Sequence, residues 1–332
     1  MTRIFHSTAI FNRRWLGNTH SPSRSISYSM VRPPRHPFHI VTLSPWPIAV
    51  GGFTLGLAGG LASWLHGHSI DLISLRTLGV VLTSKLWWRD IVIEGTYQGF
   101  HTKKVASSFY WGIGLLILSE VLFFFRFFWA YLHRALAPTP EIRCQWPPSG
   151  ISPVNPITWP LFNSVILLRS GALANLSYLY LMIGYKKKRV GAINGAILAG
   201  ILFSGVQAFE YYNAPFTIAD SVFGSAFFVL TGFHGLHVLV GTIILQVQKV
   251  RISYNHFSPT HHVGILAAIW YWHFVDIVWL ILFALVYIWG TIDIDRVWHT
   301  IYLKWFFATM AKFGFERRER MFDSFKNLNR SC

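Results

Sequence analysis

Charged residues are scarce in this sequence of 332 residues. Only 13% of the residues are charged, whereas 53% are apolar and 17% are aromatic. Soluble domains carry about 25% charged residues, so this composition argues against a soluble enzyme and is typical of a polytopic membrane protein. Nucleic acid is not expected as a partner, because the excess of positive charge is divided among the segments between apolar stretches.

Cysteine is almost absent as well. The two cysteines, Cys144 and Cys332, lie far apart in the sequence, which favours neither a disulfide framework nor a thiolate metal site. Acidic residues are missing before Asp71, and residues 1–35 contain six arginines together with many serines. This basic N-terminal arm has the composition of a mitochondrial targeting segment. A basic arm that is retained on the matrix side is the alternative.

Long apolar segments, by contrast, recur along the chain. A transmembrane helix needs about 20 mostly apolar residues. The second segment is the weakest, since it contains Asp71, Arg76 and Lys85. The predicted fold class is an all-α polytopic membrane protein with seven transmembrane helices, at roughly 45–66, 70–88, 107–134, 158–184, 191–213, 219–248 and 262–290.

Basic residues between these segments predict the orientation of the chain. The N-terminal arm and the loops after the second, fourth and sixth segments together hold fifteen lysines and arginines. The loops on the other side hold only Arg134 and Arg143. By the positive-inside rule, the N-terminus therefore faces the cytoplasm or, in an organelle, the matrix, and the C-terminus lies on the opposite side.

Several segments are more specific than generic membrane sequence. They are "SPWPIAV" (44–50), "WWRDIVIEGTYQGFHT" (87–102), "SEVLFF" and "FFWAYLHRALAPTPEI" (within 119–142), "WPPSGISPVNP" (146–156), "EYYNAPFTIADSVFGSAFFVLTGFHGLHVLVG" (210–241) and "WYWHFVDIVWL" (270–280). In this order and spacing they resemble subunit III of the haem–copper cytochrome c oxidases, the mitochondrial type in particular. The resemblance covers about 36–290. It leaves 291–332 as a basic, aromatic C-terminal extension, for which packing on a neighbouring subunit is preferred over an interfacial helix.

The resemblance implies both an architecture and a role. Two N-terminal helices would splay from a bundle of the other five and leave a V-shaped cleft that phospholipids fill. The subunit would hold no cofactor, while partner subunits hold haem a and copper. It would pack on the catalytic subunit I, near subunit II and accessory subunits, and would support proton uptake during electron transfer from cytochrome c to oxygen. The location implied is the mitochondrial inner membrane, with the C-terminus in the intermembrane space, and membership of a respiratory supercomplex stays open.

Aromatic, basic and acidic residues near the end of the second segment predict contact with lipid. Indole rings favour the membrane interface, and cations there attract lipid phosphates. From the residues alone, an ordinary aromatic belt is the better interpretation. The resemblance reverses this preference, because positions matching Trp88, Glu94, His101 and Arg251 surround a phospholipid headgroup in the family. The predicted lipid-binding residues are Trp87, Trp88, Arg89, Glu94, His101 and Arg251.

Fifteen histidines raise the question of a metal site. His234 and His237 lie at i and i+3 on one helical face, a spacing that helical metal sites use. The His-Glu-x-x-His motif of zinc proteases is absent, however. We therefore expect no metal, and we expect His234, His237 and His273 to form hydrogen bonds between helices, with Asp276 paired to a histidine or tryptophan. A stand-alone membrane enzyme or transporter built on these histidines is the alternative function.

The segment "SEVLFFFRFFWA" (119–130) places Glu120 and Arg126 among apolar residues. Glu120 matches a carboxylate that the family keeps beside the lipid cleft, and a protonated side chain bonded to a neighbouring helix is preferred over a proton relay. Arg126 lies about 120° around the helix and roughly 9 Å along it, so the two are not expected to pair.

Arginine also occurs at Arg76 and Arg169, where relatives, as at Arg126, tend to carry small or apolar residues. Neutralisation by other subunits or by lipids is the preferred explanation for these three residues. A different decoding of their codons, or transcript editing, is the alternative.

Two further acidic residues, Glu210 and Asp220, flank "YYNAPFTIA". We expect both to lie in a solvated loop, with Asp220 as the N-cap of the following helix. An acidic surface near the side where cytochrome c docks is the alternative.

Overall fold

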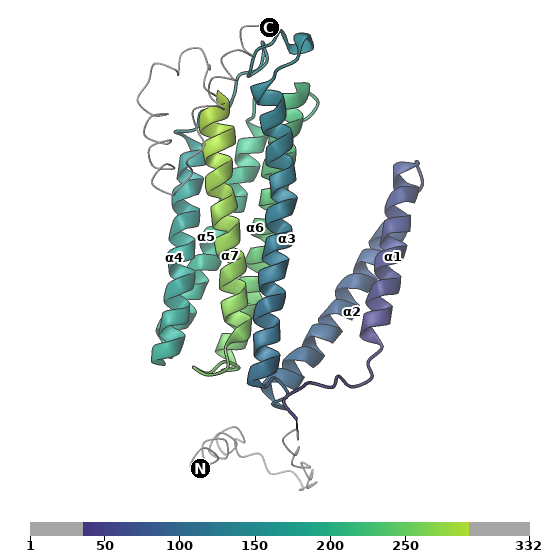
Figure 1. Cartoon of the computed structure of the whole chain (residues 1–332), viewed down its shortest axis with the longest axis vertical. Coiled ribbons are helices and arrows are strands. Elements are labelled where there is room, and N and C mark those ends of the chain that lie inside the picture. Colours follow the sequence, from purple (N-terminus) through teal and green to yellow (C-terminus); the bar gives the residue numbers. More distant parts are fainter. Residues whose placement is uncertain (1–35, 292–332) are drawn as a thin grey trace, which may run out of the picture. The chain divides into compact units, whose positions relative to one another are not determined.

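The structure, a computed structural model, describes residues 36–291 (Figure 1). The predicted N-terminal arm and nearly all of the C-terminal extension lie outside these residues. The described range contains no named β-strand. Its seven α-helices are α1 (Trp46–Leu65), α2 (Asp71–Thr96), α3 (Lys103–Leu136), α4 (Trp159–Ile183), α5 (Lys186–Tyr212), α6 (Ser221–Ser253) and α7 (Val263–Leu282).

Three short elements accompany these helices. The 3₁₀ turn η2 (Pro140–Ile142) follows α3, and α7 continues into the π-helical turns of η3 (Phe283–Ile288) and the 3₁₀ turn η4 (Trp289–Thr291).

Six of the described helices are long and apolar enough to cross a membrane, namely α1 and α3 to α7, the last together with η3. Helix α2 has 26 residues, which is long enough, but it carries six charged side chains. The prediction of seven long helices is confirmed, whereas α2 as a seventh membrane span stays a prediction.

Local sequence explains where several helices begin and end. Helix α3 begins after Thr102, whose hydroxyl accepts a hydrogen bond from the backbone of Val105. Helix α4 ends at Gly184, which has a left-handed φ of 91°. Helix α5 then begins at Lys186, so the basic residues predicted as a loop form its first turn. Helix α6 likewise continues to residue 253 and carries Arg251, which was predicted in the following loop.

Helices α3 to α7 pack around a core of large aromatic side chains from α7. The indoles of Trp272 and Trp279 are fully buried, and they donate hydrogen bonds to the hydroxyls of Ser170 (2.8 Å) and Ser164 (2.9 Å) on α4. On α6, a Cβ atom at Gly241 would lie 2.8 Å from the ring of Trp272. Small residues on the neighbouring helices therefore make room for the indoles, which is how membrane helices approach closely.

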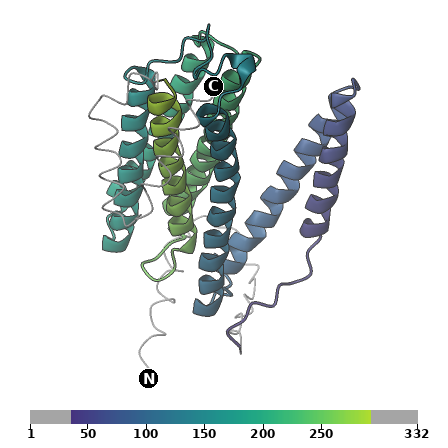
Figure 2. The same cartoon turned by 45° about the horizontal axis from the view of Figure 1, so that its top comes forward.

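Helices α1 and α2 pack on each other as a pair (Figures 1 and 2). The side chain of Arg76 lies against Gly56, and the ring of Phe53 lies against Gly79. The Trp46 indole donates a hydrogen bond of 2.6 Å to Asp90 near the other end of α2. The predicted splaying of two helices from five, with a lipid-filled cleft between them, remains a prediction.

Candidate lipid-headgroup site

The end of α2, the start of α3 and the loop between α6 and α7 bring polar side chains together. The Tyr97 hydroxyl lies 3.1 Å from Nε2 of His256, which connects the residue after α2 to the loop after α6. Nε2 of His39 lies 3.8 Å from Oε2 of Glu94 on α2. Gly99, with a φ of 71°, allows the chain to turn between α2 and α3.

His101 packs into the space that this turn creates. Its ring lies against Gly95, where a Cβ atom would collide with the imidazole. The ring also meets Phe109 edge-on, with 4.9 Å between centroids, and lies 5.7 Å from the ring of His39. Burial lowers the pKa of His101, and the charges of His39 and Arg251 lower it further. A neutral imidazole with one N–H donor is therefore favoured at pH 7.

Arg251 provides the cation of this cluster. Its guanidinium lies 4.4 Å from the centroid of the Phe257 ring, and its Nη1 fits against Gly264, where a Cβ atom would lie 2.5 Å away. Its Nε is buried and has no hydrogen-bond partner among the described residues. Within this range Arg251 also forms no ion pair. A partly buried guanidinium without an anion matches the fork of a phosphate or carboxylate.

His256 completes the set, which we call the headgroup cluster: His39, Glu94, His101, Arg251 and His256. Burial lowers the pKa of His256, and so, to a lesser extent, does the charge of Arg251. Its Nδ1 is buried and finds no partner in residues 36–291. The cluster thus combines a guanidinium that has no ion-pair partner in residues 36–291 with imidazoles and one carboxylate, a composition suited to a ligand that carries an anion and a cation.

The predicted lipid-binding residues divide into two groups in the structure. Glu94, His101 and Arg251 belong to the headgroup cluster. On α2, Arg89 forms an ion pair of 2.9 Å with the neighbouring Asp90, and Trp88 is 64% exposed. The group placed outside the cluster, one to two turns earlier on α2, consists of Trp87, Trp88 and Arg89.

Sequence reasoning missed His39 and His256. Both lie in segments predicted on the same side of the membrane as Arg251. This shared side was the only indication in the sequence that they could lie near Arg251. Because both lie far from the end of α2 in the sequence, the contacts of His39 with Glu94 and of His256 with Tyr97 could not be predicted.

Glu120 and His237 join α3 to α6 in the middle of the helices. Nε2 of His237 lies 3.0 Å from Oε2 of Glu120, and Nδ1 of His237 lies 2.7 Å from the carbonyl oxygen of Phe233. The carbonyl can only accept, so Nδ1 donates to it. A hydrogen bond between Nε2 and Oε2 then requires one further proton, carried either by a neutral Glu120 or by an imidazolium.

The other two predicted interhelical histidines contact different helices. Nε2 of His234 lies 3.3 Å from the carbonyl oxygen of Val275 on α7. Nε2 of His273 lies 2.9 Å from Oδ1 of Asn175 on α4, and its Nδ1 lies 3.3 Å from Oδ2 of Asp276. Within the described residues, no group of three or more histidine, cysteine, aspartate or glutamate side chains is arranged to hold a metal ion.

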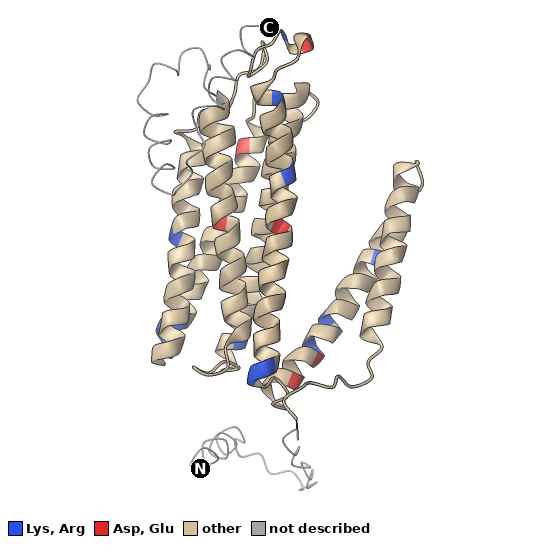
Figure 3. Cartoon of the chain, in the orientation of Figure 1, with Lys and Arg blue, Asp and Glu red and all other residues tan. Residues whose placement is uncertain are grey.

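The three unusual arginines occupy different surroundings. Arg126 is exposed on α3, with its guanidinium 5.8 Å from the ring of Phe127, and Arg169 is exposed on α4. Arg76 is half-buried between α1 and α2. None of the three forms an ion pair with a described residue. Figure 3 shows few charged residues along α3 to α7, whereas basic and acidic residues lie next to each other near the end of α2.

The two acidic residues beside "YYNAPFTIA" behave differently from each other. Glu210 was predicted in a solvated loop, and this is wrong: it lies in α5, is 3% exposed and accepts a hydrogen bond of 2.6 Å from Tyr287. Asp220 is exposed at the N-cap position of α6. Its carboxylate accepts from the backbone (2.7 Å) and hydroxyl (3.0 Å) of Thr217 in the loop, and it makes no capping bond to the helix.

Comparison with known proteins agrees with the resemblance. Residues 36–291 match the family described as cytochrome c oxidase subunit III. The chain is 49% identical over 262 residues to "Cytochrome c oxidase subunit 3" of Lumbricus terrestris, which covers 77% of this chain and 99% of the relative. It is 50% identical over 256 residues to the protein of the same name from Lycodon semicarinatus, and the match covers 77% of this chain and 98% of the relative. It is 48% identical over 257 residues to that of Pisaster ochraceus, where the match covers 77% of this chain and 99% of the relative. The chain therefore belongs to the cytochrome c oxidase subunit III family.

Proposed function

We propose that this chain is a structural subunit of the respiratory-chain cytochrome c oxidase, complex IV, with no catalytic centre of its own. It stabilises subunit I, contacts subunit II and accessory subunits, organises phospholipids and supports proton uptake by the oxidase. Haem a and copper remain in the partner subunits. The chain crosses the mitochondrial inner membrane seven times, with its N-terminus in the matrix and its C-terminus in the intermembrane space.

The lipid-organising role rests on the half-buried guanidinium of Arg251 in the headgroup cluster, which forms no ion pair with any described residue. A phospholipid phosphate accepts from this guanidinium and from the N–H groups of His101 and His256. Glu94, beside His39, accepts from the cation of a zwitterionic headgroup. The acyl chains then extend along the helices, where exposed side chains are apolar.

Such a lipid would connect the two groups of helices. Glu94 belongs to α2, whereas Arg251 and His256 belong to α6 and the loop that follows it. Tyr97 and His256 already connect the end of α2 to the loop after α6, and the bound headgroup adds a second connection between them. A bound phospholipid thereby acts as part of the packing of the subunit.

The test measures phospholipid phosphorus per haem a in purified oxidase that carries Arg251→Gln together with His101→Gln. We expect bound phospholipid to fall relative to the wild type, because two of the three phosphate donors are weakened. Lys249→Gln is the matched control, since it removes an equal charge from the same end of α6, outside the headgroup cluster, and should leave the lipid content unchanged. An unchanged lipid content in the double variant would refute the lipid-organising role.

Membership of the complex has its own discriminator. After mild detergent extraction, the chain should co-purify with haem a and copper. A stand-alone enzyme or transporter built on the histidines would bring neither.

A further inference from the structure

A second polar cluster lies at the other end of α6 from the headgroup cluster, between α5, α6 and η3. Glu210 and Gln207 are 3% and 6% exposed and lie almost one turn apart on α5. Tyr287 from η3 donates a hydrogen bond of 2.6 Å to Oε1 of Glu210. Within the described residues Glu210 forms no ion pair, so the carboxyl group is held by neutral neighbours.

Several atoms of this cluster are buried without a protein partner. Oε2 of Glu210 and both polar atoms of the Gln207 amide form no hydrogen bond with any described residue. The Gln207 amide nevertheless lies close to the hydroxyls of Tyr211 and Tyr287. Buried polar groups in proteins are almost always hydrogen-bonded. Polar groups that approach each other without meeting directly are commonly bridged by water.

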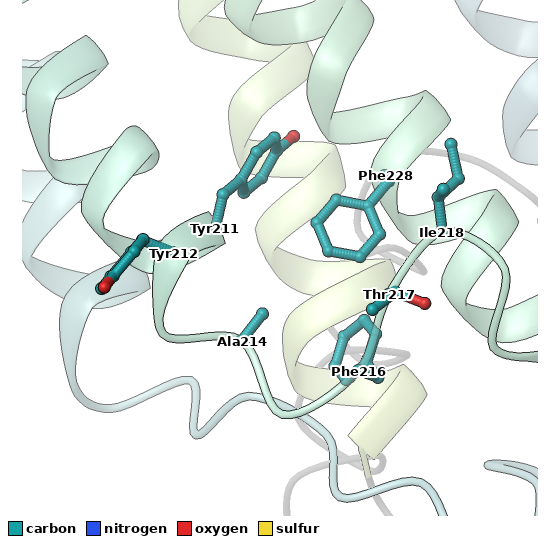
Figure 4. Close-up of a pocket in the computed structure, with 7 residues that line it drawn as sticks. All are labelled: Tyr211, Tyr212, Ala214, Phe216, Thr217, Ile218 and Phe228. Carbon is teal, nitrogen blue, oxygen red and sulfur yellow. The ribbon is translucent and has the colours of Figure 1, made fainter.

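Tyr211 connects this cluster to the surface. Its hydroxyl lies 2.6 Å from that of Thr231, which itself donates to the carbonyl oxygen of Phe227 (2.7 Å). Tyr211 therefore donates to Thr231, and its own oxygen stays available as an acceptor. The same side chain lines a surface pocket of about 530 Å³, with Phe216 and Phe228 beside it (Figure 4).

We propose that Glu210, Gln207, Tyr211 and Tyr287 enclose a binding site for ordered water, and that Glu210 exchanges its proton with the solvent through this water and the pocket beside Tyr211. One water molecule donates to the Gln207 oxygen, accepts from the Gln207 nitrogen and bonds Oε2 of Glu210, which gives it the two to four polar partners that a buried water needs. The π-helical turns of η3 bear Tyr287, and such turns often mark functional sites.

The proton balance of the exchange is simple. A protonated Glu210 gives the proton on Oε2 to the bound water, which passes a proton to a water molecule in the pocket that the Tyr211 oxygen holds as acceptor. The carboxylate that remains keeps the hydrogen bond from Tyr287 and accepts a second one from the bound water. Among the described residues, the titratable groups that face Glu210 are the phenols of Tyr211 and Tyr287.

Hydroxyl-radical footprinting of the intact, purified oxidase tests the water site. Radicals formed from bound water oxidise a buried side chain next to that water, so Tyr287 should be labelled despite its burial. Trp272 and Trp279 are the internal controls, since they are fully buried, have more reactive rings and donate to Ser170 and Ser164. Labelling of Tyr287 no faster than of these indoles would overturn the proposal.

Variants provide a second arm. Gln207→Leu should reduce the labelling of Tyr287 several-fold, whereas Gln246→Leu, at an exposed position on α6, should not. Equal labelling in both variants would contradict the site. Should Gln207→Leu fail to assemble with haem a, the footprint of the wild type still decides the question.

Infrared spectroscopy tests the proton exchange. The carboxyl band that Glu210→Gln removes should shift in D₂O, and Tyr211→Phe should slow that shift. Tyr212→Phe is the matched control, because Tyr212 lines the same pocket and is 89% exposed. A band that exchanges equally fast in Tyr211→Phe and in the wild type, or one that does not exchange, would refute the proposed route.

Discussion

The pair of α1 and α2 and the bundle of α3 to α7 are built on opposite packing principles. In the bundle, α7 buries eleven of its residues, and its indoles occupy spaces left by serine and glycine on α4 and α6. In the pair, Gly60 is the only buried residue of α1, and α2 has none. The bundle therefore holds itself together, whereas the pair presents most of its surface to its surroundings.

This difference indicates where the subunit depends on other molecules. Within a membrane, burying apolar surface between helices gains no hydrophobic free energy, because lipid is equally apolar. Helix association therefore relies on close packing and polar contacts. The bundle has both in quantity, through Trp272, Trp279 and the pair of Glu120 and His237. The contacts of α1 with α2 include close packing at three glycines, Gly56, Gly60 and Gly79, and one hydrogen bond from Trp46. Lipids and partner subunits are thus expected to complete the packing of the pair.

The largest expected effect is in the core of the bundle. Trp272→Ala removes a fully buried indole and should destabilise the subunit by about 3–5 kcal/mol. Trp88→Ala, at an exposed position of α2, should change stability by less than about 0.5 kcal/mol. Thermal denaturation of the assembled oxidase, followed by loss of this subunit, measures both. A similar loss of stability in the two variants would show that the bundle and the pair do not differ in how they are packed.

Arg126 provides the next test, on the outer face of the bundle. An arginine near the membrane centre costs about 2.5–3.5 kcal/mol, and one nearer the interface costs less. We therefore expect an exposed Arg126 to have a neutralising neighbour outside this chain or to extend its guanidinium toward the interface. We expect mass spectrometry of the peptide over residues 119–130 to show the mass of arginine. A mass that fits a small residue would instead support different decoding and remove the need for that neighbour.

The notch on α1 predicts an intermediate effect. Gly56→Leu would push into the side chain of Arg76, and overpacking of this kind costs about 1–3 kcal/mol. Gly59→Leu is the control, because nothing lies within 4 Å of a Cβ atom at that position. Protease accessibility of the segment between α1 and α2 should rise only in Gly56→Leu. Equal accessibility would show that α1 and α2 do not depend on this contact.

The link between α3 and α6 predicts a smaller loss. Glu120→Ala removes the hydrogen bond with His237, which is worth about 1 kcal/mol, whereas Glu120→Gln keeps an acceptor and donors at the same place. We expect inactivation during turnover and the proton-pumping stoichiometry to be unaltered in Glu120→Gln. A changed stoichiometry in this variant would favour the proton relay over the structural role.

The smallest expected effect is a pH dependence at the headgroup cluster. Burial lowers the pKa of His101 in the folded protein, so the unfolded chain binds more protons below its ordinary pKa of about 6.5. Stability contributed by the neutral ring is complete above that pH and declines as the pH falls. Melting temperatures of delipidated oxidase between pH 7.5 and 5.5 should therefore fall less in His101→Gln than in the wild type. An identical pH profile would contradict a neutral, buried His101.

The number and order of the helices could be predicted because apolar length is a local property of the sequence. Where prediction failed, tertiary contacts override local polarity. Helix α2 continues to Thr96, and in this part of it Asp90 accepts a hydrogen bond from Trp46 and Glu94 lies beside His39, contacts that apolar length does not report. Glu210 seemed to be a loop residue, yet Tyr287, 77 positions later, buries it.

The candidate site was only partly predictable for a similar reason. The family pattern indicated Glu94, His101 and Arg251, which the structure brings together. It also indicated Trp88, and the preference of indoles and cations for the interface added Trp87 and Arg89; these three residues share the segment but not the cluster. His39 and His256 lie far away in sequence and join through folding alone.

A density map of the assembled oxidase, in which side chains and headgroups are resolved, would show directly whether a lipid completes the packing between α2 and the bundle. We expect a phospholipid phosphate within hydrogen-bonding distance of the Arg251 guanidinium, with an imidazole N–H of His101 or His256 as a second donor. A carboxylate from another subunit in that place, or a guanidinium that contacts only protein and water, would refute this role of a lipid.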